Sequence, residues 1–220
     1  MKYLRILLFL LLTAVCAALW AAALAAASSD EWRPIDPAEL AMKTSLVEKD
    51  ADAEAIFWEV HLADEVDGGT PRTVLTQYIR IKILSERGRE SQSKIDIPYL
   101  KNWSIKDIAA RTIKPNGTIV ELKKEDVFDR TVVKASGVKR RAKSFAMPEV
   151  EAGSIIEYRW KEVRNDRLAN YIRLPFQREI PVESIKYFIK PLTLEGFPYG
   201  MRVRTFHGTG APFTKEKDGF

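Results

Sequence analysis

The sequence predicts an all-β fold: a β-sandwich of about nine or ten short, mostly antiparallel strands, preceded by a short N-terminal helix. Three observations lead to this prediction. Apolar and polar residues alternate along several stretches after residue 54, turn-forming residues separate these stretches, and no long amphipathic helix pattern follows the apolar N-terminus.

Residues 1–27 have the layout of a secretory signal peptide. Lys2 and Arg5 precede an apolar and then alanine-rich run, which ends in small residues just before Ser28. This layout predicts cleavage after residue 27 and a periplasmic or secreted location in a bacterium, with no membrane contact afterwards. The alternative is an uncleaved anchor, because residues 6–27 nearly span a bilayer. Alanine is a weak anchor residue, which favours cleavage.

Removal of the signal peptide changes the chemistry that is available. Cys16 is the only cysteine, so the mature chain has no disulfide, no thiolate nucleophile and no cysteine-type zinc site. Loss of Lys2 and Arg5 lowers Lys plus Arg from 35 to 33 against 30 acids, which leaves a net charge of +3. With this mild charge, the basic run at 134–143 predicts a solvated loop or a patch facing an acidic surface, and no nucleic-acid partner.

The segment 28–54 is expected to hold the short helix. Asp36 can cap it, Pro37 suits its first position, and Glu39 can reach back to the cap, so a helix is predicted over about 37–43. The acidic stretch 48–54 lacks the glycine and spacing of a calcium loop, and it is interpreted as solvated.

The β-sandwich domain is predicted over 55–207. In the stretch 77–84, Ile79 and its alternate neighbours face the core, whereas Arg80 and its alternate neighbours face solvent. Similar alternation predicts strands at 55–62, 155–163, 184–190 and 201–206. The tail 208–220 is expected to begin a following region of a longer protein.

Turn signals divide these strands. Pro115-Asn116-Gly117 predicts a hairpin between 105–114 and 118–122, because Asn-Gly adopts positive φ at low cost. Further turns are predicted at 67–69, 86–88 and 151–153.

Four aromatic residues are candidates for a binding site: Trp103, Tyr158, Trp160 and Tyr171. If exposed, they would form a platform for stacking sugars or peptides. If buried, they are core residues between two sheets. The charged residues that alternate with Tyr158 and Trp160 favour the core for these two.

No catalytic residue, metal ligand or cofactor is predicted. His61 and His207 have no partners that the sequence identifies, and no nucleophile elbow, phosphate loop or dinucleotide fingerprint occurs. A hydrolase that uses carboxylates alone stays open, because the 30 acids include chance pairs. Such an enzyme would need two carboxyl groups about 5 to 9 Å apart in a cleft.

Several segments together resemble a bacterial domain of unknown function that precedes transglutaminase-like domains in exported proteins. They occur in the family's order over roughly residues 32–200. The segments are Trp32–Ile35, Pro37–Leu40, Ala51–Ala55, Ile113–Thr118, Met147–Tyr158 and Pro175–Val182.

The resemblance implies a β-sandwich without assigned catalytic residues, placed before a core that carries a Cys-His-Asp constellation. Phe220 comes before any such core, so its activity does not transfer to these residues. We therefore expect a non-catalytic accessory or binding domain whose partner is a downstream transglutaminase-like domain, or a polypeptide or glycan of the cell envelope. The alternative is a free-standing carbohydrate- or peptide-binding module.

Overall fold

The computed structural model describes residues 32–135, 138–192, 203–206 and 214, and the side chains of all of these except 132–135 and 138–140. The predicted signal peptide, His207 and most of the predicted tail lie outside the described residues. Residues 32–35 belong to a separate N-terminal unit, and the β domain lies in the unit that begins at Asp36. Among the described residues, no helix has the length and apolar character needed to cross a membrane.

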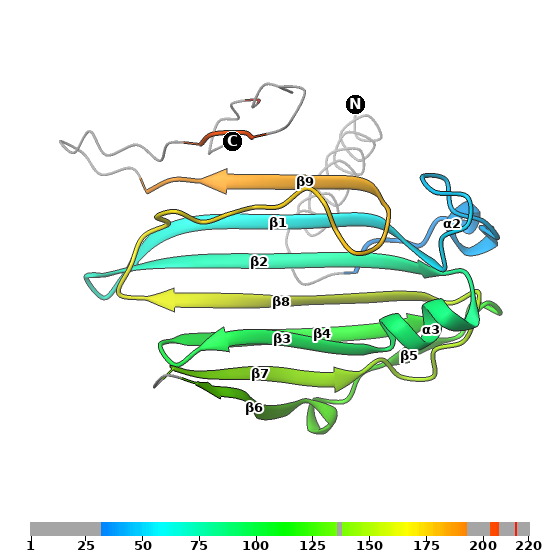
Figure 1. The fold of residues 1–220 in the computed structure, drawn as a ribbon, viewed down its shortest axis with the longest axis horizontal. Coiled ribbons are helices and arrows are strands. Elements are labelled where there is room, and N and C mark those ends of the chain that lie inside the picture. Colours follow the sequence, from blue (N-terminus) through cyan, green and yellow to red (C-terminus); the bar gives the residue numbers. More distant parts are fainter. Residues whose placement is uncertain (1–31, 136–137, 193–202, 207–213, 215–220) are drawn as a thin grey trace, which may run out of the picture. The chain divides into compact units, whose positions relative to one another are not determined.

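Nine strands in the described residues form two sheets, which confirms the predicted all-β sandwich. The larger sheet has the order β5-β4-β8-β2-β1-β9, and the smaller has the order β3-β7-β6 (Figure 1). The strands are β1 (Ala53–Asp67), β2 (Thr70–Ile83), β3 (Lys94–Leu100), β4 (Trp103–Ile113), β5 (Ile119–Glu121), β6 (Phe128–Ala135), β7 (Val138–Ala146), β8 (Ile155–Asn165) and β9 (Val182–Lys190).

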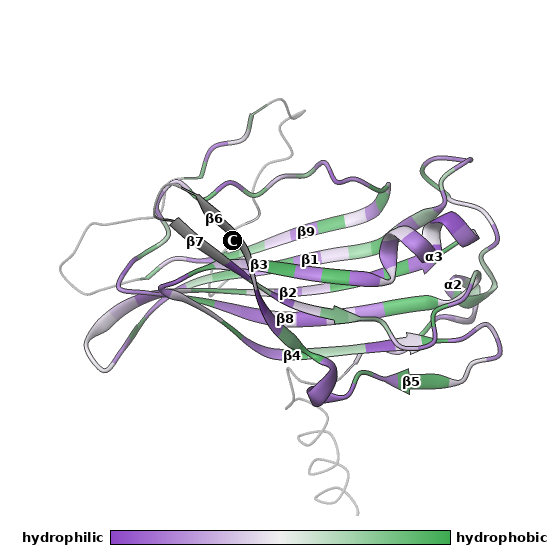
Figure 2. Cartoon of the chain, turned by 60° about the horizontal axis from the view of Figure 1, so that its bottom comes forward, coloured by the Kyte–Doolittle hydropathy of each residue, from purple (hydrophilic) through white to green (hydrophobic). Residues whose placement is uncertain are grey.

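The two sheets enclose the main core. Ile79, Ile81 and Ile83 of β2 are fully buried on the face of the large sheet that we call the inner face. Figure 2 shows hydrophobic and hydrophilic positions mixed along the strands, as two-sided strands require. The small sheet covers part of the inner face with Ile95, Ile97, Tyr99 and Phe145.

The opposite, outer face of the large sheet differs from the prediction. Arg80 and Lys82 of β2 were expected to face solvent, but both are buried. The chain around helix α2 (Pro37–Ala41) accounts for their burial, because Glu39 lies 2.7 Å from Arg80 Nη1 and the Leu40 carbonyl accepts a 2.7 Å hydrogen bond from Lys82. A helix of one turn therefore turns a predicted wet surface into an interior one.

Helix α2 itself confirms the predicted start. The Asp36 side chain accepts from Ala38 N at 2.8 Å, Pro37 occupies the first turn, and Glu39 completes the capping box. The helix ends at Ala41, two residues before the predicted end.

The turn predicted at 86–88 is wrong, because helix α3 (Glu86–Gln92) begins there. Ser85 is its N-cap and accepts from Gly88 N at 3.2 Å, a start signal that the glycine obscured. The turns at 67–69, 115–117 and 151–153 are confirmed, each with a glycine at positive φ. A short 3-10 helix, η1 (Lys124–Asp126), follows β5.

Three other local predictions are corrected. Residues 203–206 are not a strand, although 201–206 was predicted as one. Glu54 is not in a solvated loop but lies buried in β1, where it accepts hydrogen bonds from Ser45 Oγ and from the backbone N–H groups of 46 and 47. The basic run was predicted as a solvated loop, but its Arg141 and Lys143 lie on strand β7 and pair with Asp129 of β6.

One connection crosses the inner face. β8 and β9 run in the same direction, since both are aligned with β1, so the chain between them must pass over β2 and β1. Figure 1 shows this link, residues 166–181, which we call the crossover segment. Its Ile172 and Leu174 pack on a second core cluster, which contains Val60, Leu62, Leu75 and Ile189.

Candidate functional site

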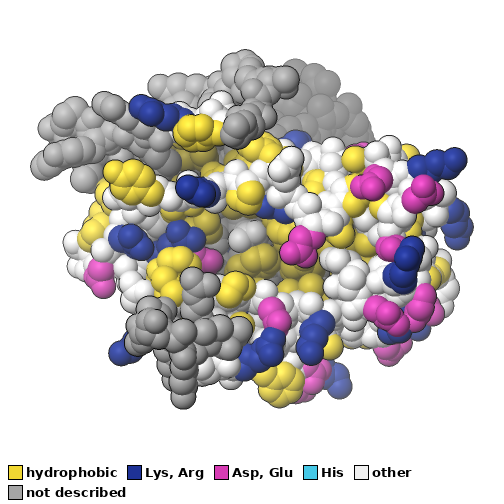
Figure 3. Space-filling model, in the orientation of Figure 1, with side chains coloured by type: hydrophobic (Ala, Val, Ile, Leu, Met, Phe, Trp, Pro, Cys, Tyr) yellow, Lys and Arg dark blue, Asp and Glu magenta, His cyan; other side chains and the backbone are white. Residues whose placement is uncertain are grey.

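A groove lies between the crossover segment and the inner face of the large sheet. A cavity of about 230 Å³ has Trp58, Val60 and Leu75 among its lining residues. A neighbouring cavity of about 360 Å³ shares Arg164, Ile172 and Arg173 with it. Figure 3 shows hydrophobic side chains gathered on this side of the molecule, with Lys and Arg side chains around them. The two cavities together are large enough for part of an extended chain or for a small molecule.

The lining of the groove is strongly basic. Its described residues include four arginines and a single acid, Glu162. The arginines follow one another at the end of β8 and along the crossover segment: Arg164, Arg167, Arg173 and Arg178. The formal charge of the lining is therefore +3.

Arg164 and Arg178 are positioned by aromatic side chains. The Arg164 guanidinium lies 4.0 Å from the centroid of the Trp103 ring, and its Nε is 2.5 Å from Glu162. The Arg178 guanidinium lies 4.3 Å from the centroid of the Trp58 ring. Such cation–π contacts hold an arginine in one place while its charge stays available.

Tyr187 of β9 fixes the other side of Arg178. Its hydroxyl accepts from Arg178 Nη2 at 2.8 Å and donates to the Pro175 carbonyl, which ties β9 to the crossover segment. Burial raises the pKa of Tyr187 above its usual value, against the opposing effect of Arg178, so the phenol stays protonated at neutral pH.

Three N–H donors of this face are buried without a hydrogen-bond partner among the described residues: Trp103 Nε1, Trp160 Nε1 and Arg178 Nε. Arg178 lines the groove, and Trp103 contacts the groove residue Arg164. Buried donors are normally paired, so these three N–H groups are exceptions to the usual pairing.

The structure separates the four predicted aromatic residues. Tyr158 and Trp160 are buried in the main core, where their rings stack with centroids 5.9 Å apart. An exposed platform made from these two is therefore not formed, as the alternating charges favoured. Trp103 is half-buried beneath Arg164, and Tyr171 is fully exposed beside the groove.

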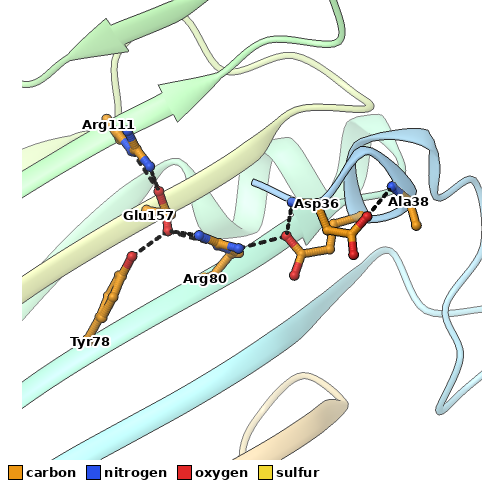
Figure 4. A network of polar contacts seen from close by, with 7 residues as sticks. Asp36, Ala38, Tyr78, Arg80, Arg111 and Glu157 are labelled. Atoms are coloured by element: carbon orange, nitrogen blue, oxygen red, sulfur yellow. Dashed lines mark hydrogen bonds and ion pairs between the residues drawn. The ribbon is translucent and has the colours of Figure 1, made fainter. Parts of the chain in front are cut away.

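A charged network occupies the outer face (Figure 4). The Glu157 carboxylate is fully buried, and it accepts from Tyr78 Oη at 2.7 Å and from Arg80 Nε at 2.8 Å. Its second oxygen lies 2.6 Å from Arg111. Burial lowers the pKa of Arg80, but the charge of Glu157 and their hydrogen bond outweigh it, so the pKa is raised. A carboxylate held in this way is suited to support structure rather than to exchange protons.

Lys82 is the other unusual group of the outer face. Its ammonium donates to the carbonyls of Leu40, at 2.7 Å, and Gly153, at 2.6 Å. Burial, together with the nearby charge of Lys43, lowers the pKa of Lys82 to about 8. Lys82 therefore links α2 to the 151–153 turn through backbone oxygens.

Of the two histidines outside the predicted signal peptide, the structure describes one. His61 is exposed and stacks on Phe188 with ring centroids 4.4 Å apart, whereas His207 lies outside the described residues. Within the described ranges, no three His, Cys, Asp or Glu side chains are grouped so as to hold a metal ion.

The sequence interpretation missed the arginines. They stand at positions 164, 167, 173 and 178, in a stretch without strand alternation between two predicted strands. Their density was a usable signal, because a long irregular connection that carries charge often holds a site. What the sequence did not reveal is that this connection crosses the sheet.

Comparison with known proteins gives one family and a fold. The family model DUF3857, a domain of unknown function with a solved structure, matches residues 71–216. No curated protein matches the chain. Among solved structures, a crystal structure of a suspected protease from Parabacteroides distasonis is similar with a TM-score of 0.51 and 17% identity, over 64% of this chain.

The chain spans 29% of the length of that Parabacteroides protein, so the similarity concerns the fold of one part of it. A CBM3a-L domain from the scaffoldin of the Clostridium thermocellum cellulosome also matches, with 14% identity over 50% of this chain and 68% of that domain. Its TM-score of 0.28 is too low to support an argument. Because the family model covers most of the described β domain, the chain belongs to the DUF3857 family of domains of unknown function.

Proposed function

We propose that this chain is a non-catalytic binding domain of an exported bacterial protein, and that it holds a polypeptide in the groove beside the crossover segment. The observation that carries the proposal is the groove itself, whose lining combines the half-buried apolar side chains of Ile172 and Leu174 with arginines of β8 and the crossover segment. The large sheet lies beneath this lining and gives a rigid base for an extended chain.

The aromatic rings favour a polypeptide over a glycan. Sugar binding needs flat ring faces that are open to the ligand. Trp58 is covered by Arg178, Trp103 is covered by Arg164, and Trp160 stacks on Tyr158 in the core. Of the four aromatic residues predicted from the sequence, only Tyr171 presents an exposed ring.

The two acids that are fully buried, Glu54 and Glu157, support a non-catalytic role. Glu157 is enclosed by two arginines and a tyrosine. Both carboxylate oxygens of Glu54 accept hydrogen bonds from the backbone N–H groups of 46 and 47. Both carboxylates are thus committed to holding the fold. In our proposal the domain is exported by the segment 1–27 and presents or orients polypeptide for a transglutaminase-like domain in a longer product.

The test uses the full chain, expressed with its own N-terminal segment in a bacterial host. Mass spectrometry of the periplasmic product reports whether the chain is cut before Ser28. The purified product is then titrated against short fluorescein-labelled peptides and incubated with peptidase, amide-transfer and glycosidase substrates. Saturable peptide binding without turnover supports the proposal; robust turnover in any of the three assays overturns it.

A further inference from the structure

We propose that the groove selects acidic polypeptide segments, with Arg178 and Arg173 as the residues that contact side-chain carboxylates of the ligand. This inference deepens the proposed function and rests on it. Among the described residues, Glu162 is the only acid in the lining of the groove, so three of the four positive charges there are not balanced within the lining.

The four arginines have different roles. Arg164 already has a carboxylate partner in Glu162, and it serves mainly to complete the wall. Arg167 and Arg173 are exposed, and the structure gives their side chains no ion pair among the described residues. Arg178 is half-buried and bound to a phenol and an indole ring, neither of which neutralises its charge.

The geometry at Arg178 favours a carboxylate in particular. Its Nη2 donates to Tyr187, whereas its buried Nε has no partner among the described residues. A guanidinium offers its donors as a planar fork that fits the two oxygens of a carboxylate. The buried Nε of Arg178 is closed to a ligand, so a carboxylate in the groove would meet the Nη end of Arg178 and the exposed guanidinium of Arg173.

The surroundings favour a peptide as the carrier of that carboxylate. The half-buried Ile172 and Leu174 and the exposed Pro175 form an apolar surface next to the arginines. A segment that alternates acidic and aliphatic residues would place one kind of side chain on this surface and the other on the arginine wall. We therefore expect an extended segment in which glutamate or aspartate alternates with leucine or valine.

The binding experiment compares three fluorescein-labelled peptides by fluorescence anisotropy with the full chain. In them leucine alternates with glutamate, with glutamine or with lysine. We expect the glutamate peptide to bind at least about tenfold more tightly than the glutamine peptide, and the lysine peptide to bind most weakly. The affinity of the glutamate peptide should fall as salt is added, because its attraction to the arginines is electrostatic.

Two variants and a control localise the effect. R173Q should weaken binding of the glutamate peptide about threefold to tenfold and leave the melting temperature unchanged, because Arg173 is exposed. R178Q should weaken it more. R87Q is the matched control: Arg87 is also an exposed arginine, but it pairs with Asp52 away from the groove lining, so binding should be unchanged.

The outcomes separate the two proposals. Equal affinity for the glutamate and glutamine peptides, or an R173Q variant that binds like the wild type, overturns the selection of acidic segments while peptide binding stands. Failure of all three peptides to bind overturns the proposed function as well. Tighter binding of hyaluronan, a carboxylated glycan, than of the glutamate peptide would show that the groove takes a glycan instead.

Discussion

Arg80 of β2 and Glu157 of β8 are register partners in neighbouring strands, and their side chains meet at 2.7 Å with both residues buried. Arg111 approaches the same carboxylate from β4, and Glu39 reaches Arg80 from helix α2. One ion network thus joins three strands of the large sheet to the N-terminal segment. The network is structural, and its energetic role can be measured.

Replacing Glu157 with glutamine should lower the free energy of unfolding by about 3 to 5 kcal/mol, because the buried carboxylate that Arg80 and Arg111 share loses its charge, while Arg80 keeps Glu39 as a partner. Chemical denaturation at neutral pH measures this. E149Q is the control, since Glu149 is exposed and its ion-pair partner among the described residues is Lys114 at 3.2 Å; it should change stability by less than about 0.5 kcal/mol. A loss of similar size in both variants would show that Glu157 does not carry the network.

Lys82 should make stability depend on pH. Its pKa is about 8 in the folded chain and about 10.4 when unfolded. Between these values the unfolded chain binds more protons, so the contribution of Lys82 to the free energy of unfolding rises with pH from about 8 and is lowest on the acid side. Tyr99, whose pKa burial raises to about 12, acts in the opposite direction above pH 10.

The prediction is tested by the difference in free energy of unfolding between the wild type and a variant that lacks the ammonium group. Urea unfolding of the wild type and of K82M is followed across the range from neutral to alkaline pH. The difference in stability should shift in favour of the wild type as the pH rises through 8. A constant difference for K82M would contradict the lowered pKa.

Gly88 should not tolerate a side chain. A Cβ at this position would lie 2.0 Å from the Asp52 carbonyl oxygen, a backbone atom that also accepts from Leu84 N and Ser85 N. G88A should therefore cost about 3 kcal/mol of stability despite the better helix propensity of alanine. Thermal unfolding measures it against E90A, a substitution at an exposed position of the same helix, which should be close to neutral. A stable G88A would mean that α3 shifts away from β1 easily.

Asp64 should hold the crossover segment in place. Its Oδ1 accepts from Thr73 Oγ1 at 2.6 Å and from Ala169 N at 2.9 Å, which ties the segment to β1 and β2. In D64A, trypsin should cut at Arg167 and Arg173 several-fold faster than in the wild type. The crossover segment would unfold locally more often, and a protease cuts a locally unfolded segment. D107A is the control, since Asp107 is exposed and pairs with Lys161. Equal cutting rates would show that packing of Ile172 and Leu174 alone fixes the segment.

The sequence predicted the fold class well because strand alternation and turn chemistry are local signals. Ile79, Ile81 and Ile83 alternate regularly, and Asn116-Gly117 sits between two paired strands. Where the prediction failed, the deciding contact was distant in sequence. Arg80 looks solvated from its own strand, and its burial depends on two residues distant in sequence, Glu39 and Glu157.

The candidate site was less predictable for the same reason. Trp103 and Tyr171 were singled out as aromatic residues, and both lie near the groove arginines. The groove itself depends on β8 and β9 being parallel to each other, and hence on where the crossover segment runs. No local pattern in 166–181 specifies that path.

The parallel pairing of β1 with β9 has a consequence for how the chain acquires its binding surface. β1 forms a hairpin with β2 early, whereas its other edge must wait until β9, far along the sequence, has been synthesised. Pairings between distant segments form slowly, since a long loop has to close first. The groove wall is therefore a late product of folding: residues 166–181 cannot close over β1 and β2 until β9 has paired with β1.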